Sequence, residues 1–208
     1  VLSRDPWLVL LHDVFTETEC NALIEIGGVN FHRSKDAGSM TEADDHQFES
    51  VVSDVRTSST NWCVEGCFDH PVINGMAQKA ENITLIPKEN SEYFQVLRYE
   101  PGQYYREHHD FIADHVSMPQ GPRIYTFYIY LNDVEQGGGT RFPHLNATVE
   151  PKRGSVAIWP SVLNSDPLQR EDRANHEALP VERGVKYGAN MWLHMYNFQG
   201  PFSLTCTG

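Results

Sequence analysis

The sequence has no apolar run of the roughly 18–20 residues needed to cross a bilayer, so we expect no membrane insertion by this segment. It is also poor in basic residues, with 16 Lys and Arg against 28 Asp and Glu and a formal net charge of −12. Proteins that coat nucleic acid or anionic lipid need a basic face, which argues against nucleic acid as a partner. A 40% hydrophobic fraction excludes wholesale disorder, and we expect a single domain over residues 1–208.

Cysteines are few, and their even number is compatible with disulfides. The four are Cys20, Cys63, Cys67 and Cys206, and the sequence does not separate the three possible pairings of two disulfides. Cys63 and Cys67 are close enough to pair locally. Two alternatives stay open, namely free buried thiols and a four-thiolate zinc site, although the isolation of Cys20 and Cys206 disfavours zinc.

The first residues contain no initiator Met, basic n-region or apolar h-region, so we expect any signal peptide or anchor to have been removed. Two Asn-x-Thr sequons begin at Asn82 and Asn146. With the even cysteine count they favour the secretory pathway, and we expect the protein in the lumen of the endoplasmic reticulum or Golgi. The oligomeric state does not follow from the sequence.

The first half of the chain predicts helices. An apolar strand over 7–15 precedes a helix that Thr16 caps, with Glu19 placed to complete a capping box and Gly27-Gly28 to end it. The polar residues 32–50, with acidic residues at 42–45, predict a loop. A second helix is expected over 70–84, with one apolar face made of Val72, Ile73, Met76, Ala80 and Ile83.

From residue 91 the pattern changes to short strands separated by turns. A glycine-rich turn lies at 136–139. The strands are expected over 92–99, 123–131, 155–159, 176–181 and 185–195. Helices followed by closely spaced strands indicate an α+β domain with a β-barrel or sandwich core.

Ten histidines are many for this length, and the segment Arg106-Glu107-His108-His109-Asp110 is the most informative. In a strand, His108 and Asp110 point to one face and His109 to the other. One imidazole and one carboxylate are two of the three ligands in the two-histidine-one-carboxylate triad that holds non-haem Fe(II). The alternative is an ordinary surface loop.

A third ligand would have to come from elsewhere in the chain. The candidates are His115, His144, His176 and His194. His115 is too close in sequence to lie on an opposing strand, and His144 sits in a turn. His176 begins a strand, and the strands between it and Asp110 could return the chain to the same place.

Lys186 begins a strand whose alternation separates two kinds of side chain. One face is apolar, and the other carries Lys186, Gly188, Asn190, Trp192 and His194. A lysine inside a barrel is costly unless it meets an anion, so this face could line a site for an anionic ligand. The alternative is an edge strand with a solvated lysine.

Taken in order, these motifs resemble the catalytic domain of prolyl 4-hydroxylases, which are Fe(II)- and 2-oxoglutarate-dependent dioxygenases. The resemblance spans nearly the whole chain apart from residues 32–50 and 160–175, and one departure is Gly139, where the family commonly has an acidic residue. The matching segments are Arg56 to Ser59, Tyr99 to Asp110, Gly137 to Pro143, His176 to Val181, and Lys186 with Trp192 and His194.

The resemblance implies an α+β fold with a double-stranded β-helix (jelly-roll) core and supporting helices. It implies Fe(II) bound by His108, Asp110 and His176. The implied reaction uses O2 and 2-oxoglutarate, hydroxylates peptidyl proline and releases succinate and CO2, with ascorbate as the reductant. The implied partner is a proline-rich or collagen-like peptide.

The resemblance also implies roles in binding. Lys186 would pair with the distal carboxylate of 2-oxoglutarate, assisted by the hydroxyls of Tyr99 and Thr140. The positions that match the peptide side of the pocket are Arg56, Ser58, Tyr105, Arg123, Trp192 and His194.

Two other classes of function remain open at this stage. One is a 2-oxoglutarate dioxygenase that acts on another side chain or on a small molecule. The other is a non-catalytic jelly-roll that binds peptide or sugar, which would leave the complete ligand set and Lys186 without a purpose.

Overall fold

Strand β9 (Arg123–Tyr130) lies at the centre of the fold because its alternating side chains serve both faces of the main sheet. Phe127 and Ile129 enter a hydrophobic core shared with the helices, whereas Tyr128 and Tyr130 enter a second core on the opposite face. The computed structural model describes residues 1–40, 48–51 and 54–205.

The elements have the following bounds. The helices are α1 (Glu17–Gly27), α2 (Pro71–Thr84) and α3 (Gln199–Ser203). The strands before β9 are β1 (Ser3–Arg4), β2 (Trp7–Leu11), β3 (His32–Arg33), β4 (Asp36–Met40), β5 (Phe48–Val51), β6 (Ser59–Cys63), β7 (Phe94–Tyr99) and β8 (Tyr105–His108). The strands after it are β10 (Gln136–Gly137), β11 (Thr140–Phe142), β12 (Ala147–Val149), β13 (Val156–Pro160), β14 (His176–Ala178), β15 (Val181–Arg183) and β16 (Lys186–His194).

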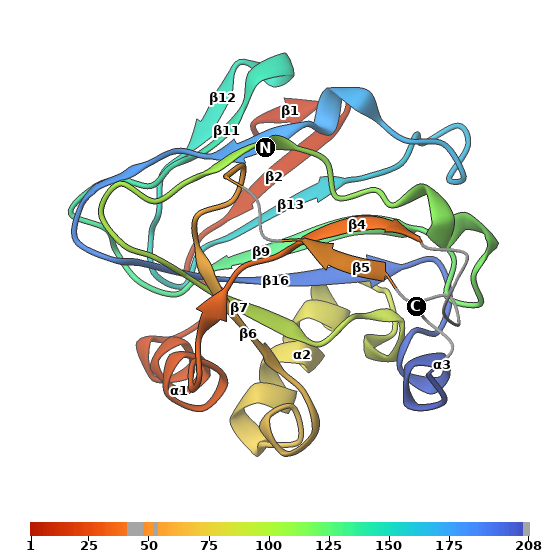
Figure 1. The fold of residues 1–208 in the computed structure, drawn as a ribbon, viewed down its shortest axis with the longest axis horizontal. Helices are drawn as coiled ribbons and strands as arrows, with labels where there is room; N and C mark the ends of the chain where they lie inside the picture. The colour runs from red at the N-terminus through yellow and green to blue at the C-terminus, as the bar shows by residue number, and fades with distance from the viewer. Residues whose placement is uncertain (41–47, 52–53, 206–208) are drawn as a thin grey trace.

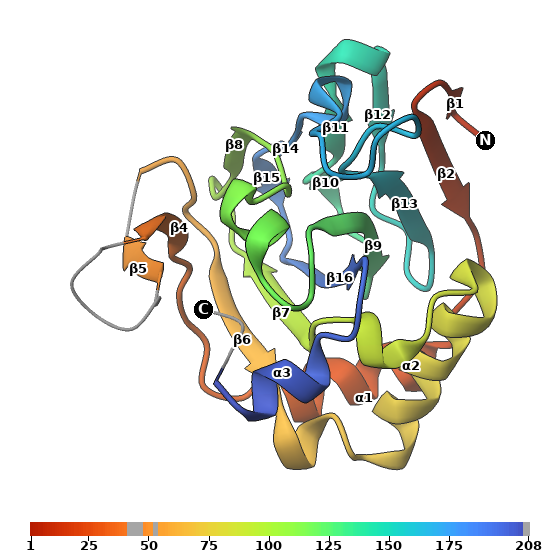
Figure 2. The same cartoon turned by 90° about the vertical axis from the view of Figure 1, so that its right-hand side faces the viewer.

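Two sheets form the jelly-roll. The large sheet has the order β1-β2-β13-β9-β16-β7-β6-β3, and the small sheet has the order β12-β11-β14-β8. Two short pairs, β4-β5 (Figure 1) and β10-β15 (Figure 2), complete the strands of the described residues. This confirms the predicted α+β double-stranded β-helix.

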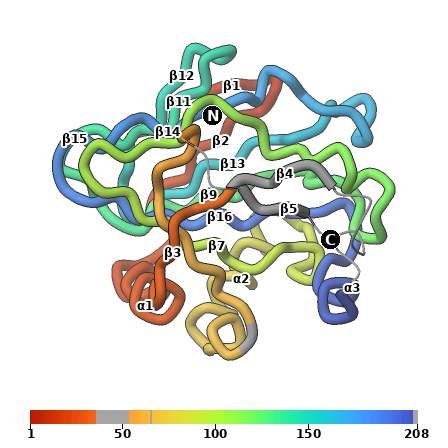
Figure 3. Tube along the Cα trace, in the orientation of Figure 1, coloured from red at the N-terminus to blue at the C-terminus, as the bar shows by residue number. Residues whose placement is uncertain are grey.

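Helices α1 and α2 cover the outer face of the large sheet, on the side away from β11, β12 and β14 (Figures 2 and 3). The predicted capping box begins α1, since Thr16 Oγ1 accepts from the Glu19 amide at 3.2 Å and Glu19 Oε2 accepts from the Thr16 amide at 2.8 Å. At the other end, Gly27 lets α1 approach β7 closely, because a Cβ there would lie 2.9 Å from Val96 Cγ2.

Several sequence-based boundaries were wrong. The first strand ends at Leu11, and Asp13 follows with a positive φ that turns the chain toward α1. The predicted loop over 32–50 contains β3, β4 and β5, because backbone pairing at a sheet edge needs no apolar pattern; its acidic residues 42–45 lie outside the described residues. The strand expected over 176–181 is two strands, of which β14 pairs with β8 and β11 and β15 pairs with β10.

The apolar face of α2 is also shifted from the prediction. Ile73, Met76 and Ala80 are buried as expected, but Ala77 joins them and Ile83 is 38% exposed. The last turn of α2 therefore extends beyond the core. Within the described ranges, no helix is long and apolar enough to cross a membrane.

Two substitutions on α2 test this placement. Ile73→Ala should lower the free energy of unfolding by about 2–5 kcal/mol, because the fully buried side chain leaves a cavity. Ile83→Ala should cost about 1 kcal/mol or less. Urea denaturation followed by tryptophan fluorescence measures both, and equal losses would contradict the packing of α2.

Candidate active site

Three potential metal ligands converge from two strands of the small sheet. His108 ends β8, Asp110 follows two residues later, and His176 begins β14, where it lies directly opposite His108 in the strand register. Asp110 Oδ2 is 3.6 Å from His176 Nε2, and Asp110 Oδ1 is 4.0 Å from His108 Nε2. One donor atom from each residue lies within 4.8 Å of the others. The structure thus brings together the three residues predicted as ligands.

Backbone carbonyls fix both imidazoles with their Nε2 atoms available. His108 Nδ1 lies 2.8 Å from the carbonyl oxygen of Arg106, and His176 Nδ1 lies 3.1 Å from that of Ala174. A carbonyl oxygen can only accept, so Nδ1 carries the proton and the neutral ring keeps a lone pair on Nε2. Ligands about 2.1 Å from an ion lie about 3–4 Å apart, so a small contraction would accommodate Fe(II).

The carboxylate of the triad is also held in its ligating form. Burial alone would raise the pKa of Asp110, but His176, His108 and the Thr126 hydroxyl outweigh it and keep the pKa below the usual range. Thr126 donates to Asp110 Oδ2 at 2.6 Å. Burial lowers the pKa of His108 well below its ordinary value, and His176 lowers it further. The resulting donors, neutral imidazole and ionised carboxylate, are the forms that bind a divalent metal.

Lys186 lies at the end of the site near Tyr99 and Tyr128, which line the cavity, and is itself 1% exposed and outside the lining. Its Nζ donates to the carbonyl oxygen of Gly138 at 2.6 Å. Its Nζ also lies 5.3–5.6 Å from the ring centroids of Tyr99, Tyr128 and Tyr130. Burial lowers the pKa of Lys186 to about 7, and Glu150 opposes this effect. Such a cation is suited to an anionic ligand, and the prediction of a lysine inside the barrel is correct.

The hydroxyl-bearing side chains predicted for the same end lie around it. Thr140 is buried on β11 and accepts from Tyr130 Oη at 2.9 Å, and Tyr99 is buried on β7 opposite Lys186 in the register. Thr140 and Tyr99 both line the cavity that contains the three candidate ligands. Two of the three residues predicted to bind the cosubstrate therefore line the same cavity as the candidate metal ligands.

Two of the residues predicted on the peptide side form a stack against the metal site. The Tyr105 ring lies parallel to the His108 ring at a centroid distance of 3.5 Å, and the Arg56 guanidinium carbon lies 4.7 Å above Tyr105. Arg56 is held by Gln95 Oε1 at 3.0 Å and by Ser58 Oγ at 3.4 Å. Ser58 is fully buried behind Arg56 and does not line the cavity.

A second wall is built on Trp192 and Arg123. The Arg123 guanidinium carbon lies 3.8 Å from the Trp192 ring centroid, and Arg123 donates to both oxygens of Glu92 at 2.5 and 3.0 Å. The ring nitrogens of His194 lie 2.8 Å from Glu92 Oε1 and 2.8 Å from the Gly121 carbonyl oxygen. Burial alone would raise the pKa of Glu92, but Arg123 and His194 outweigh it and lower it to about 2. His194 therefore lies behind the wall and orients it.

The cavity between these walls has a volume of about 1000 Å³. It extends from the candidate metal ligands past Trp192 to Trp62 and Phe202. The Trp62 and Trp192 rings are 5.9 Å apart. A cavity of this size exceeds what one proline side chain and one dicarboxylate need, which leaves room for the neighbouring residues of a peptide.

Two important residues escaped the sequence analysis. Thr126 shares the inner face of β9 with Tyr128 and Tyr130, so the alternation along that strand contains the signal that identifies it. Glu92 lies just before β7, and nothing local distinguishes it from a surface acid. Of the other histidine candidates, His115 is buried beside His194 with ring centroids 5.3 Å apart, and His144 is exposed.

The jelly-roll, the convergent His-Asp-His set and the buried lysine define a 2-oxoglutarate-dependent iron oxygenase. A family model described as the 2OG-Fe(II) oxygenase superfamily matches residues 94–194, which include all three ligands and Lys186. Prolyl 4-hydroxylase 2 of Arabidopsis thaliana is 33% identical over 219 residues, covering 95% of this chain and 70% of that protein. Prolyl 4-hydroxylase subunit alpha-2 of Gallus gallus is 30% identical over 192 residues, covering 91% and 34%.

A solved structure agrees. The viral collagen prolyl hydroxylase from Paramecium Bursaria Chlorella virus-1, in its complex with 2OG, superposes with a TM-score of 0.70 at 26% identity, covering 90% of this chain and 96% of that one. The chain belongs to the prolyl 4-hydroxylase family and is an Fe(II)- and 2-oxoglutarate-dependent dioxygenase.

The pKa of Lys186 predicts how cosubstrate binding depends on pH. As pH rises through about 7 the ammonium loses its proton, so the apparent KM for 2-oxoglutarate should rise by about tenfold per pH unit above that point. In Lys186→Arg, whose side chain stays charged, the same plot should be flat, whatever its absolute KM. Steady-state succinate formation between pH 6 and 9 measures both, and a flat wild-type plot would contradict the role of Lys186.

Proposed function

We propose that this protein hydroxylates proline residues in peptides, with O2 and 2-oxoglutarate as cosubstrates and succinate and CO2 as products. The observation that carries the proposal is an unpartnered donor in the cavity wall. Trp192 lines the cavity and is 6% exposed, and its indole Nε1–H has no acceptor among the described residues. Buried donors in proteins nearly always have a partner, so this N–H favours a ligand that brings a carbonyl oxygen. A peptidyl proline offers a backbone carbonyl beside an apolar ring.

The protein supplies ligands, orientation and shielding. His108, Asp110 and His176 would hold Fe(II), which when bound supplies the activation of O2 coupled to decarboxylation of 2-oxoglutarate. Lys186 would pair with the distal carboxylate of 2-oxoglutarate through a charge-assisted hydrogen bond, with Thr140 beside it. Burial of this end excludes water from the cosubstrate.

The walls of the cavity favour a proline-rich or collagen-like peptide. Tyr105 and Trp192 present aromatic surfaces, which suit the rings of an extended polyproline II segment. Arg56 and Arg123 lie over these aromatic rings and bring donors to the same walls. We also propose ascorbate as the reductant that keeps the iron ferrous, as the family resemblance implies.

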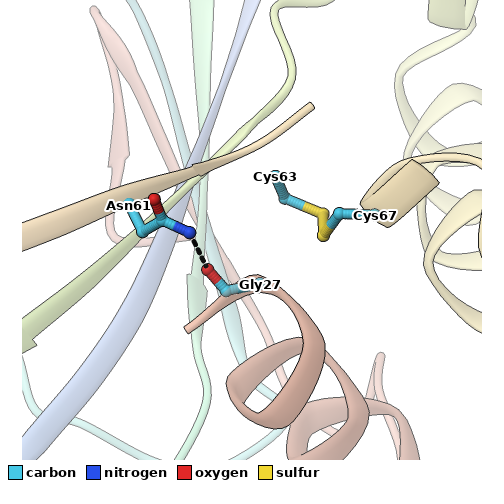
Figure 4. Close-up of a disulfide and its surroundings, with 4 residues drawn as sticks. All are labelled: Gly27, Asn61, Cys63 and Cys67. Carbon is cyan, nitrogen blue, oxygen red and sulfur yellow. Dashed lines mark hydrogen bonds between the residues drawn. A yellow bond between two sulfur atoms is a disulfide. The ribbon is translucent and has the colours of Figure 1, made fainter. Parts of the chain in front are cut away.

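A disulfide supports a location in the lumen of the endoplasmic reticulum or Golgi. Cys63, at the end of β6, is joined to Cys67 in the short turn Glu65–Cys67, close to the point where Asn61 Nδ2 donates to the Gly27 carbonyl oxygen at 2.9 Å (Figure 4). Disulfides persist mainly in oxidising compartments.

The other two cysteines add nothing to this argument. Cys20 is free and buried, and burial raises its pKa to about 11, so it is unreactive. Cys206 lies outside the described residues.

The central experiment offers a panel of proline-rich and collagen-like peptides to the protein with Fe(II), 2-oxoglutarate and ascorbate. We expect succinate and hydroxyproline in equal amounts, and a shorter linear phase without ascorbate. His176→Ala should abolish turnover because one ligand is lost, whereas His144→Ala, at an exposed histidine outside the ligand set, should retain it.

The outcomes of this assay separate the alternatives. Succinate without hydroxyproline on any peptide would indicate a dioxygenase with another substrate. The absence of succinate with the metal site occupied would indicate a binding module.

The proposed compartment is tested on the full chain expressed in a eukaryotic cell. Protein from the lumen is alkylated before digestion. It should yield a peptide in which Cys63 and Cys67 carry no alkyl group and are joined to each other by a disulfide. Recovery in the cytosol with both cysteines alkylated would contradict the proposed location.

A further inference from the structure

His109 lies between two metal ligands in the sequence and, contrary to the sequence-based expectation, lines the same cavity. Both of its ring nitrogens are occupied. Its Nδ1 accepts from the backbone N–H of Phe111 at 2.9 Å, and its Nε2 lies 2.9 Å from the carbonyl oxygen of Glu171. Because a backbone N–H can only donate, Nδ1 is unprotonated, and Nε2 carries the proton that it donates to Glu171. The geometry thus specifies one neutral tautomer.

The acceptor of this bond is the start of a hydrogen-bonded path to the third ligand. The same Glu171 carbonyl oxygen accepts from the Ala174 N–H at 2.9 Å. The Ala174 carbonyl oxygen in turn accepts from Nδ1 of His176 at 3.1 Å. His109 is therefore connected, through one turn of backbone, to the bond that sets the orientation of the His176 ring.

Glu171 is well anchored, so the bond from His109 has a fixed acceptor. Its backbone N–H donates to the Ser161 carbonyl oxygen at 3.1 Å. Its side chain is buried and accepts from Arg173 Nε and Nη2, both at 2.7 Å, and Arg173 also donates to Asp5 at 3.1 and 3.2 Å. These contacts hold the loop that precedes β14, part of the 160–175 segment that no family motif covers.

We propose that His109 is a positioning residue of the metal centre, which couples the segment bearing His108 and Asp110 to the loop that orients His176. The strand pairing between β8 and β14 is irregular beyond His176, since its register shifts before Ala178. The His109–Glu171 bond supplies a second connection between the two segments. Outer partners that orient metal-binding histidines commonly change metal affinity by about 10–100-fold when they are lost.

Two variants separate the two hydrogen bonds of His109. In His109→Gln the side-chain Nε2 lies as many bonds from the backbone as the imidazole Nε2, so it can still donate to Glu171. In His109→Asn the oxygen takes the place of Nδ1 and can accept from Phe111, but no donor reaches Glu171. The probe is Mn²⁺ added to metal-free protein, with the free ion quantified by electron paramagnetic resonance.

We expect His109→Asn to weaken Mn²⁺ binding by about tenfold or more, and His109→Gln to stay within about threefold of the wild type. The melting temperature of the metal-free protein should be similar for both variants. His12→Asn is the matched control, because His12 contacts Ser155 Oγ at 3.1 Å and does not line the cavity, and it should bind Mn²⁺ like the wild type.

Wild-type affinity in His109→Asn would overturn the proposal. Equal losses in the Asn and Gln variants would also overturn it, as would a loss in the Asn variant fully accounted for by unfolding. If His109→Asn does not fold, His109→Met, which fills the space without either hydrogen bond, takes its place with the same expected loss. Because no peptide is used, the outcome is independent of the substrate proposed above.

Discussion

The antiparallel pairing of β8 with β14 is the constraint on which the rest of the site depends. It places His176 directly opposite His108, although the two residues are distant in the chain. Neither segment alone contains more than two ligands, so the metal site exists only once the small sheet has formed. Backbone carbonyls then orient both imidazoles, and Thr126, from the large sheet, orients the carboxylate. The geometry of the three candidate ligands therefore also depends on how the two sheets pack against each other.

One face of the large sheet packs against the helices, and its other face is turned toward the candidate active site. Along β16, Ala189 and Met191 pack with the helices, while Trp192 lines the cavity and Lys186 lies beside Tyr99 on the same face. Gly188 lies on the site face, where a Cβ would lie only 2.2 Å from Tyr128 Oη. The absence of a side chain there is what allows the tyrosine to approach the strand beside Lys186. The two-residue period of the strand thus separates the two tasks within nine consecutive residues.

The same period explains which parts of the site were predictable. His108, Asp110 and Lys186 carry part of their information locally, in spacing and in alternation. The structure brings His108 and Asp110 together, although Asp110 lies in a bend after β8 rather than within the strand. Glu92 and the His109–Glu171 bond depend on which distant segments meet, and no local pattern encodes that. Residues such as Ser58 and His194 share a motif with the site but lie behind its walls, because a motif does not distinguish a lining residue from its support. Edge strands such as β3 escaped prediction because backbone hydrogen bonds, rather than side chains, define them.

Near Lys186, an acidic side chain from another chain segment lies beside a position where the family resemblance leads us to expect an acidic residue. Gly139 stands where the family commonly has an acidic residue, yet the Glu150 carboxylate oxygens lie 3.3 and 3.4 Å from the position a Cβ of residue 139 would occupy. The chain segment just after β12 therefore places an acidic group beside position 139. This negative charge partly offsets the effect of burial on Lys186 and helps to keep its ammonium form accessible before an anionic ligand arrives. The chemistry of this end depends on the charges placed around Lys186, and Glu150, just after β12, supplies one of them.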